Sequence, residues 1–303
     1  MVLEMIRGVN IERRRNLLYI INDLFKVKQT ILLLYVGVFG YLIAAGSNID
    51  LVKIVLILLS QFLTIGGTTG VNMVLDADLD AVMMRTRNRV IPSGVITKSE
   101  AILISGTALA IGLLVSYMIS WVYMLIGLAG FLIDIVVYTM LMKRRTWLSV
   151  VFGGFAGGAP ALGGYVAYTN QIDLIGISLM LIVALWSSPH IWYISAYYIE
   201  DYKRANIPTP PVLYGMRVTA LGSIIMLLII YLLIAILFIV SNYRIWISLT
   251  LSSMLTAILI TKMLRHAMNS EIDKREIRGI FKFLSPYLAL IFLAIYLDKL
   301  FLF

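Results

Sequence analysis

Long apolar runs alternate with short polar segments along the whole chain. A membrane-spanning helix needs about 20 mostly apolar residues, and several runs reach that length. They cover Gln29–Gly46, Leu51–Val71, Ala101–Ile119, Val122–Met142, Trp147–Thr169, Leu174–Tyr197, Val218–Val240, Ile245–Thr261 and Phe283–Leu300. These runs are too long for barrel strands and lack their strict apolar–polar alternation. The pattern predicts an all-α integral membrane bundle of nine transmembrane helices, forming one domain over residues 1–303.

The composition supports a membrane protein and excludes several other classes. Hydrophobic residues make up 61% of the chain and charged residues only 14%, whereas a soluble domain is about 45–50% apolar and about 25% charged. A soluble enzyme, a disordered protein and a compact nucleic-acid-binding domain are therefore excluded. The chain has no cysteine and only two histidines, His190 and His266, which excludes thiolate metal sites and a histidine-rich metal cage.

Lysine and arginine are distributed unevenly between the predicted loops. Nearly all of the 25 basic residues fall in the N-terminal segment, residues 1–28, and in the second, fourth, sixth and eighth loops. The exceptions are Lys53, Arg244 and Lys299. Because basic loops remain on the cytoplasmic side, we expect a multi-pass protein of the cell membrane with a cytoplasmic N-terminus and an outside C-terminus. The net charge of +9 then reflects orientation in the lipid bilayer rather than a nucleic-acid partner.

The long loops after the second, sixth and eighth spans place most polar residues at the cytoplasmic face. After the second span, Asn72, Asp76 and Asp80 follow one another at intervals of four, so a continuing helix would carry all three on one face. Stacked oxygen ligands of this kind suit Mg²⁺, which completes its shell with water and phosphate oxygens. Asp78 falls on another face. The alternative is a solvated helix end that pairs with nearby arginines.

Basic residues follow these acids closely. Arg85 and Arg89 lie a few positions downstream, and guanidinium groups beside cation-binding carboxylates suit a strongly anionic group such as diphosphate. The sixth loop again places aromatic, acidic and basic residues just past a membrane span, with Tyr197, Asp201 and Lys203. Two acidic helix ends above an apolar helical bundle indicate a membrane enzyme that acts on an amphipathic diphosphate, with a prenyl chain as the apolar part.

Several motifs also resemble a known family. The Asn72-x₃-Asp76-x₃-Asp80 pattern and the basic residues after it resemble the first aspartate-rich motif of the UbiA superfamily of intramembrane prenyltransferases. Residues 138–146, 186–190 and 201–208 are more narrowly similar to the branch of the superfamily that farnesylates protoheme IX. This resemblance implies a central cavity open to the cytoplasmic side. It also implies Mg²⁺-dependent transfer of farnesyl from farnesyl diphosphate to a vinyl group of heme b, which gives heme O and diphosphate.

The resemblance also assigns roles to individual residues. Asn72, Asp76, Asp80 and Asp201 would bind Mg²⁺ and diphosphate as the catalytic group. The residues that would contact the phosphates are Arg85, Arg89, Lys143 and Lys203. One departure is Tyr198, which occupies a position where the family pattern has an arginine.

Aromatic and lone polar residues inside the spans are further candidates. A prenyl cation needs a dry pocket, and aromatic faces can stabilise it. The candidate pocket walls are Tyr138, Tyr165, Trp192, Tyr193 and Tyr197, although aromatic residues at this depth also serve simply to pack. His190 and Asp134 are functional candidates because polar residues are costly in a membrane, or else they bond to neighbouring helices. We expect His266, in the basic eighth loop, to be solvated.

Two alternative functions remain open from the sequence. A prenyltransferase with the same donor site could act on another acceptor, such as an aromatic acid, a quinone precursor or a glycerol phosphate lipid. A transporter with an acidic cation site is the non-enzymatic alternative, although the basic cluster beside the acids would repel a cation.

Overall fold

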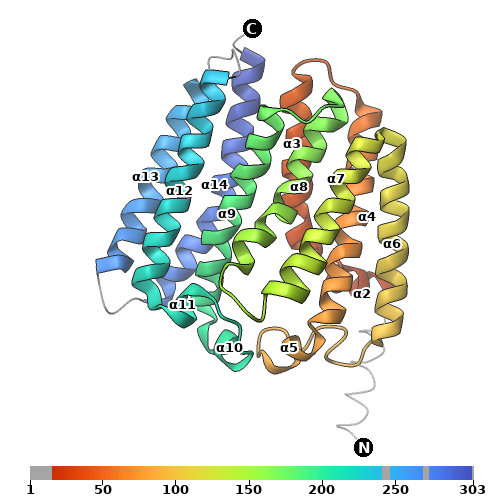
Figure 1. Ribbon diagram of the computed structural model, residues 1–303, viewed down its shortest axis with the longest axis vertical. Coiled ribbons are helices and arrows are strands. Elements are labelled where there is room, and N and C mark those ends of the chain that lie inside the picture. The colour runs from red at the N-terminus through yellow and green to blue at the C-terminus, as the bar shows by residue number, and fades with distance from the viewer. Residues whose placement is uncertain (1–15, 241–245, 269–272, 302–303) are drawn as a thin grey trace, which may run out of the picture.

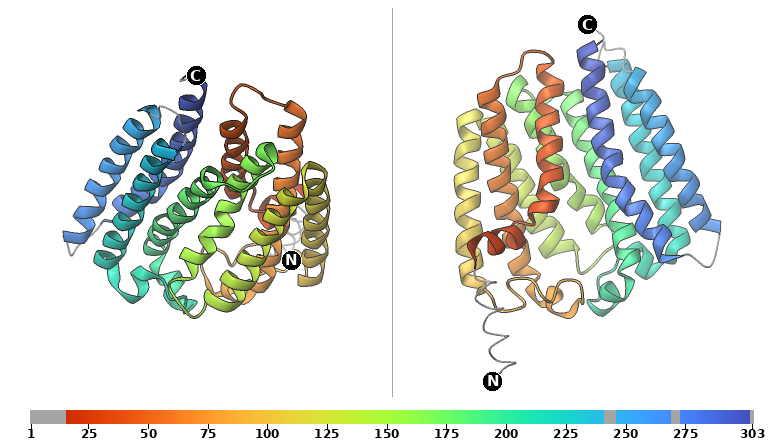
Figure 2. Two further views of the ribbon diagram at one scale, coloured as in Figure 1. Left: turned by 45° about the horizontal axis from the view of Figure 1, so that its top comes forward. Right: turned by 180° about the vertical axis from the view of Figure 1, so that it is seen from behind.

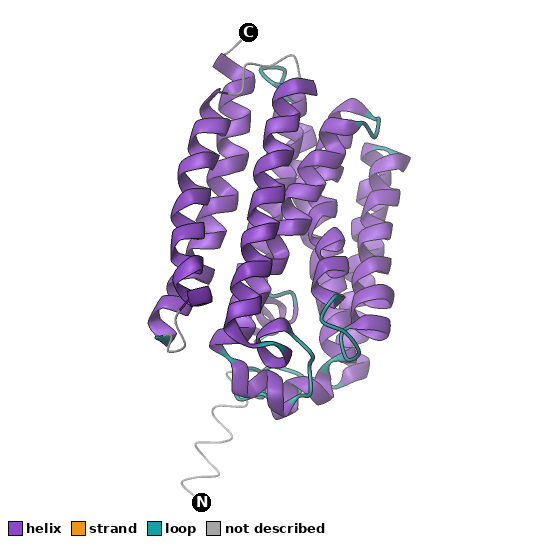
Figure 3. Ribbon diagram, turned by 60° about the vertical axis from the view of Figure 1, so that its left-hand side comes forward, coloured by secondary structure: helices purple, strands orange, loops and turns teal. Residues whose placement is uncertain are grey.

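The described part of the chain is entirely helical. The computed structural model describes residues 16–240, 246–268 and 273–301. Within these ranges, nine helices are long and apolar enough to cross a membrane, as predicted (Figures 1 and 3). They are α3 (Val27–Ala45), α4 (Leu51–Leu75), α6 (Lys98–Ile119), α7 (Trp121–Leu132) continuing as η1 (Ile133–Met142), α8 (Ser149–Thr169), α9 (Leu174–Tyr197), α12 (Gly215–Val240), α13 (Trp246–Met268) and α14 (Lys274–Phe301).

Two boundaries differ from the prediction in ways that matter for function. Helix α4 continues past Val71 to Leu75, so it carries Asn72 in its last turn. Helix α14 begins at Lys274 rather than Phe283, because Ile277 and Ile280 continue its buried stripe while the charged side chains face outward. The eighth loop is therefore much shorter than predicted. The predicted start of the eighth span, residue 245, lies outside the described residues.

Four short helices lie at one end of the bundle, which we call the polar end. They are α2 (Leu17–Leu24), α5 (Ala77–Val82), α10 (Ile199–Arg204) and α11 (Pro210–Leu213). Figures 1 and 2 show α5, α10 and α11 close together below the long helices. The predicted acidic motifs belong to α4, α5 and α10, so the fold brings both motifs to this end.

Small residues allow the central helices to pack backbone against backbone. A methyl group on Gly164 of α8 would collide with the carbonyl of Gly37 in α3, and one on Gly40 would collide with the carbonyl of Ala161. Gly154 and Gly158 face α9 in the same way. Close helix contact through small residues is typical of membrane bundles. The glycines of α8, the fifth membrane span, therefore serve helix packing at these positions.

Candidate active site

A cavity of about 650 Å³ lies at the polar end between α3, α4, η1, α9 and α14. Its polar lining combines most of the residues that the sequence singled out. They are Asn72, Asp76, Asp80, Arg85, Arg89, Asp134, Tyr138, Lys143 and His190, joined by Lys26 and Lys28. Residues far apart in the sequence thus converge on one space that contains both acids and bases.

The first acidic motif lines this cavity because helical hydrogen bonding continues past the end of α4. The Asp76 amide donates to the Asn72 carbonyl at 3.0 Å, and the Asp80 amide donates to the Asp76 carbonyl at 2.8 Å. The chain bends between α4 and α5, yet the three side chains keep the same direction. None of the three is more than 6% exposed, so each needs a partner to offset its desolvation.

A basic side chain meets each member of this motif. The Lys143 ammonium binds Asp76, and Arg89 Nη1 donates to Asp80 Oδ2 at 2.7 Å. Lys26 Nζ donates to Asn72 Oδ1 at 3.4 Å. These charge-assisted bonds hold ammonium and guanidinium groups at the position where an anionic substrate would bind.

Lys26 was missed as a site residue and was counted only as a topological charge. It joins α2 to α3 in the left-handed backbone conformation, with φ 47° and ψ 51°, which is costly for a residue other than glycine. Burial, together with the nearby positive charges of Arg89 and Lys143, lowers the pKa of Lys26 to about 8. The sequence does show a lysine immediately before a long apolar run. Packing of the helix that follows buries such a lysine, and this position could have indicated a site residue.

The π-helix η1 aligns the amide of Asn72, and nothing in the sequence pattern predicted it. The Lys143 amide donates five residues back to the Tyr138 carbonyl at 2.7 Å. Thr139 Oγ1 donates to the Asp134 carbonyl at 2.7 Å and accepts from Asn72 Nδ2 at 2.6 Å. Because the Asn72 nitrogen is engaged, its oxygen faces Lys26. Short π-helical segments are frequent at functional sites.

Asp201 is outside the cavity lining, and it connects α10 to the loop after α5. Its two carboxylate oxygens accept the backbone amides of Met84 at 3.0 Å and Arg85 at 3.1 Å, and Arg204 adds a bond of 2.9 Å. The Arg85 guanidinium lies 5.0 Å from the centre of the Tyr198 ring. Thus Tyr198, at the position where the family pattern has an arginine, supports a cation at the cavity rim.

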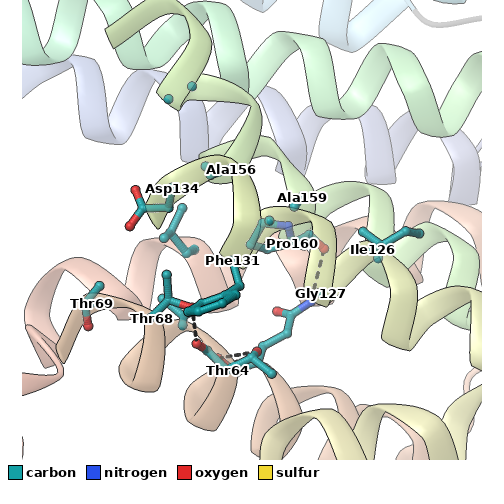
Figure 4. Close-up of a pocket in the computed structure, with 18 of the residues that line it drawn as sticks. Thr64, Thr68, Thr69, Ile126, Gly127, Phe131, Asp134, Ala156, Ala159 and Pro160 are labelled. Carbon is teal, nitrogen blue, oxygen red and sulfur yellow. Dashed lines mark hydrogen bonds between the residues drawn. The ribbon is translucent and has the colours of Figure 1, made fainter. Parts of the chain in front are cut away.

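A second, apolar chamber of about 310 Å³ adjoins the main cavity between α4, α7, η1 and α8 (Figure 4). The two spaces share wall residues, including Thr69, Asp134 and Tyr138. Gly127, Phe131 and Ala156 are typical of the remaining lining. The arrangement has the amphipathic character expected of a site for a charged head and an apolar tail.

Several residues predicted for the pocket, and Lys203, which was predicted to contact the diphosphate, are outside the lining of both spaces. Tyr165 donates its hydroxyl to Asp173 at 2.7 Å, near the opposite end of the bundle. Trp192 packs edge-on against Trp147, with ring centres 6.2 Å apart. Lys203 is exposed and pairs with Glu200 at 3.3 Å.

The remaining aromatic candidates lie between α9 and the C-terminal helices. Tyr193 is fully buried, with its ring 5.8 Å from that of His266, and Tyr197 packs edge-on against Phe281. The expectation that His266 is solvated is wrong: it is 2% exposed, because α13 continues through the predicted loop. By contrast, His190 lines the main cavity and stacks on Trp186 at 4.7 Å.

The donor set around Asp76 fits Mg²⁺. Asp76 Oδ1 is buried without a hydrogen-bond partner, and Asn72 and Asp80 line the same cavity. Throughout the described ranges, no three His, Cys, Asp or Glu side chains are grouped closely enough to hold an ion. An ion here would therefore complete its coordination with water and phosphate oxygens, which is the preference of Mg²⁺.

Comparison with known proteins identifies the family. The model of the UbiA prenyltransferase family matches residues 33–285. The chain belongs to this family. It is therefore a prenyltransferase, and the transporter alternative no longer applies.

Two proteins that are similar to this chain over most of its length have the same name. A protein of Thermofilum pendens named protoheme IX farnesyltransferase is 54% identical over 202 residues, covering 67% of this chain and 71% of its own. A protein of the same name from Korarchaeum cryptofilum is 41% identical and covers 92% of this chain and 93% of its own.

Solved structures share the fold. One described as digeranylgeranylglyceryl phosphate synthase is similar with a TM-score of 0.74 at 22% identity, covering 93% of this chain and 98% of its own. A UbiA homolog from Archaeoglobus fulgidus bound to GPP and Mg²⁺ gives 0.64 at 18% identity, covering 91% and 99%. These likenesses show the shared fold, and the nine long helices of the described residues agree with the predicted membrane bundle.

Proposed function

We propose that this protein transfers a farnesyl group from farnesyl diphosphate to a vinyl group of heme b, which gives heme O and diphosphate. The observation that carries the proposal is the 41% identity to a protoheme IX farnesyltransferase over 92% of the chain. The main cavity and the apolar chamber support it, because together they suit a charged head and an apolar tail. By the positive-inside rule, the polar end faces the cytoplasm.

Different residues of the cavity have different roles in binding the prenyl diphosphate. Asn72, Asp76 and Asp80 would hold Mg²⁺, which when bound offsets the negative charge of the diphosphate leaving group. Lys26 and Lys143, which contact Asn72 and Asp76, bind phosphate oxygens beside the metal-binding side chains. Their charges are fixed before the reaction, so they stabilise the departing anion with little reorganisation.

Other residues of the cavity and the chamber suit the rest of the diphosphate, the prenyl tail and the heme. Arg85 and Arg89 hold the diphosphate at the rim. The apolar chamber takes the prenyl tail and excludes water from the allylic carbon. Trp186 and His190 present a flat, stacked aromatic pair from α9, and we assign them to the heme side of the cavity.

A direct assay tests this function. Purified full-length protein is incubated with farnesyl diphosphate, Mg²⁺ and heme b, and mass spectrometry detects farnesylated heme. We expect product with the wild type and with Asp78→Asn, whose carboxylate pairs with Arg144 outside the cavity. Asp76→Asn should raise the Mg²⁺ concentration required for half-maximal rate, and chelation should stop the reaction. Absence of any prenylated heme would refute the acceptor assignment.

A second candidate acceptor is a glycerol phosphate lipid. The similarity to a structure described as digeranylgeranylglyceryl phosphate synthase favours testing it. The same donor and protein are supplied with a glycerol phosphate lipid in place of heme. Prenylated lipid without prenylated heme would transfer the assignment to this acceptor.

A further inference from the structure

Asp134 lies where the two spaces meet. It lines both the main cavity and the apolar chamber, and among the described residues that line both it is the only charged one. Figure 4 shows its carboxylate at the end of the chamber opposite Ile126. It is part of neither acidic motif, and no step of the proposed function has used it.

The Asp134 carboxylate differs from the other acids of the site. Asp76, Asp80 and Asp201 each bind a lysine or arginine side chain. For Asp134, by contrast, no hydrogen bond or ion pair of the carboxylate is found among the described residues. Its backbone carbonyl is held by Thr139, so the residue is fixed in place while its charge faces the cavity. A carboxylate without a counter-ion at membrane depth is costly and indicates a functional role.

The two-part structure of a prenyl diphosphate indicates which part of the donor lies beside the Asp134 carboxylate. Cations bind the diphosphate in the main cavity, and the apolar chamber takes the prenyl tail. The bond that breaks joins these two parts, so it lies at the passage between the spaces. The residues that line both spaces include Thr69, Asp134 and Tyr138, which places these side chains beside this passage.

We propose that Asp134 stabilises the positive charge that develops on the allylic carbon of the donor. The carbon–oxygen bond breaks, its electron pair leaves with the diphosphate, and Asp134 neither gains nor loses a proton. A fixed opposite charge in a water-excluded site contributes strongly at this stage. The inference rests on the donor half of the proposed function and not on the acceptor.

Steady-state kinetics of diphosphate release test the role of Asp134. We expect Asp134→Asn to lower kcat on the order of 100-fold, with little change in KM for farnesyl diphosphate. Asp134→Glu, which keeps the charge, should recover part of the rate. The matched control is Asp78→Asn, which removes an exposed carboxylate outside the cavity and should retain the wild-type rate. Binding of farnesyl thiolodiphosphate, a slowly reacting analogue, checks that the site of each variant is intact.

Several outcomes would overturn the proposal. A kcat for Asp134→Asn within about twofold of wild type would do so, as would a higher KM at constant kcat, which indicates binding alone. Loss of analogue binding in both Asp134 variants would indicate a structural role. Failure of the acceptor assignment is distinguishable, because diphosphate release without farnesylated heme still measures ionisation.

Discussion

Replacing Asp201 with alanine removes the acceptor for two backbone amides in the loop after α5. The amides of Met84 and Arg85 donate to its two oxygens at 3.0 and 3.1 Å, and the carboxylate is only 5% exposed. A buried donor left without a partner costs about 1–3 kcal/mol. The bond to Arg204 adds little, because that side chain is half exposed. Loss of the partner of two amides should therefore lower the local stability of the loop over residues 83–96 by about 2–6 kcal/mol.

Limited trypsin digestion measures this loss directly, because Arg85 and Arg87 are exposed within the loop. When opening is fast, cleavage follows the population of the open form, and 2 kcal/mol corresponds to roughly a 30-fold increase, since about 1.4 kcal/mol is tenfold. We expect cleavage in Asp201→Ala to be faster by at least that factor. Asp201→Asn, which keeps one acceptor oxygen, should be intermediate. Asp78→Ala should match the wild type.

A different result would restore the interpretation made from the sequence alone. If the cleavage rate of Asp201→Ala equals that of the wild type while its Mg²⁺ requirement rises as in Asp76→Asn, then Asp201 acts as a metal ligand. If cleavage accelerates and the Mg²⁺ requirement stays constant, Asp201 positions Arg85 by joining α10 to the loop after α5.

Three further substitutions probe the cations, the chamber and the packing. Lys26→Met should weaken binding of farnesyl thiolodiphosphate by at least tenfold, since a bond to a charged group contributes about 1.5–3 kcal/mol; unchanged affinity would remove Lys26 from the site. Gly127→Leu should shift donor preference from farnesyl toward geranyl diphosphate, because a Cβ there meets only Leu113 at 3.6 Å and a larger side chain fills the chamber; an unchanged preference would place the tail elsewhere. Gly164→Ala should lower the Tm in detergent, since overpacking costs about 1–3 kcal/mol, whereas Gly279→Ala, where nothing lies within 4 Å, should not; equal Tm values would contradict the close contact.

The fold could be predicted because the bilayer imposes a simple rule on the sequence. Each span needs a long apolar run, and each loop charge indicates a side of the membrane. The convergence of Asn72, Asp76 and Asp80 was also predictable, because spacing of four residues survives the bend between α4 and α5. Local periodicity was sufficient for these features.

The pocket walls were not predictable in the same way. Helices α8 and α9 are apolar on all sides, so their sequence does not indicate which face meets the cavity. Tyr165 and Tyr193 are as apolar in context as Tyr138, yet only Tyr138 lines the two spaces. The π-helix and the partners of Asp201 depend on contacts between distant segments. Lys26 was missed for the same reason, since its burial depends on how α2 and α3 join.

The contact between α3 and α8 determines which part of the molecule can be redesigned. Gly164 of α8 touches the backbone of Gly37 in α3, so even a methyl group on Gly164 would force the two helices apart. The wall of the chamber formed by α7 has room at Gly127. With the donor tail in the chamber, as proposed, donor length can therefore be adjusted on α7 while the contact between α3 and α8 stays unchanged. A library of variants with substitutions in α7 alone would test donor specificity without disturbing the packing of α3 against α8.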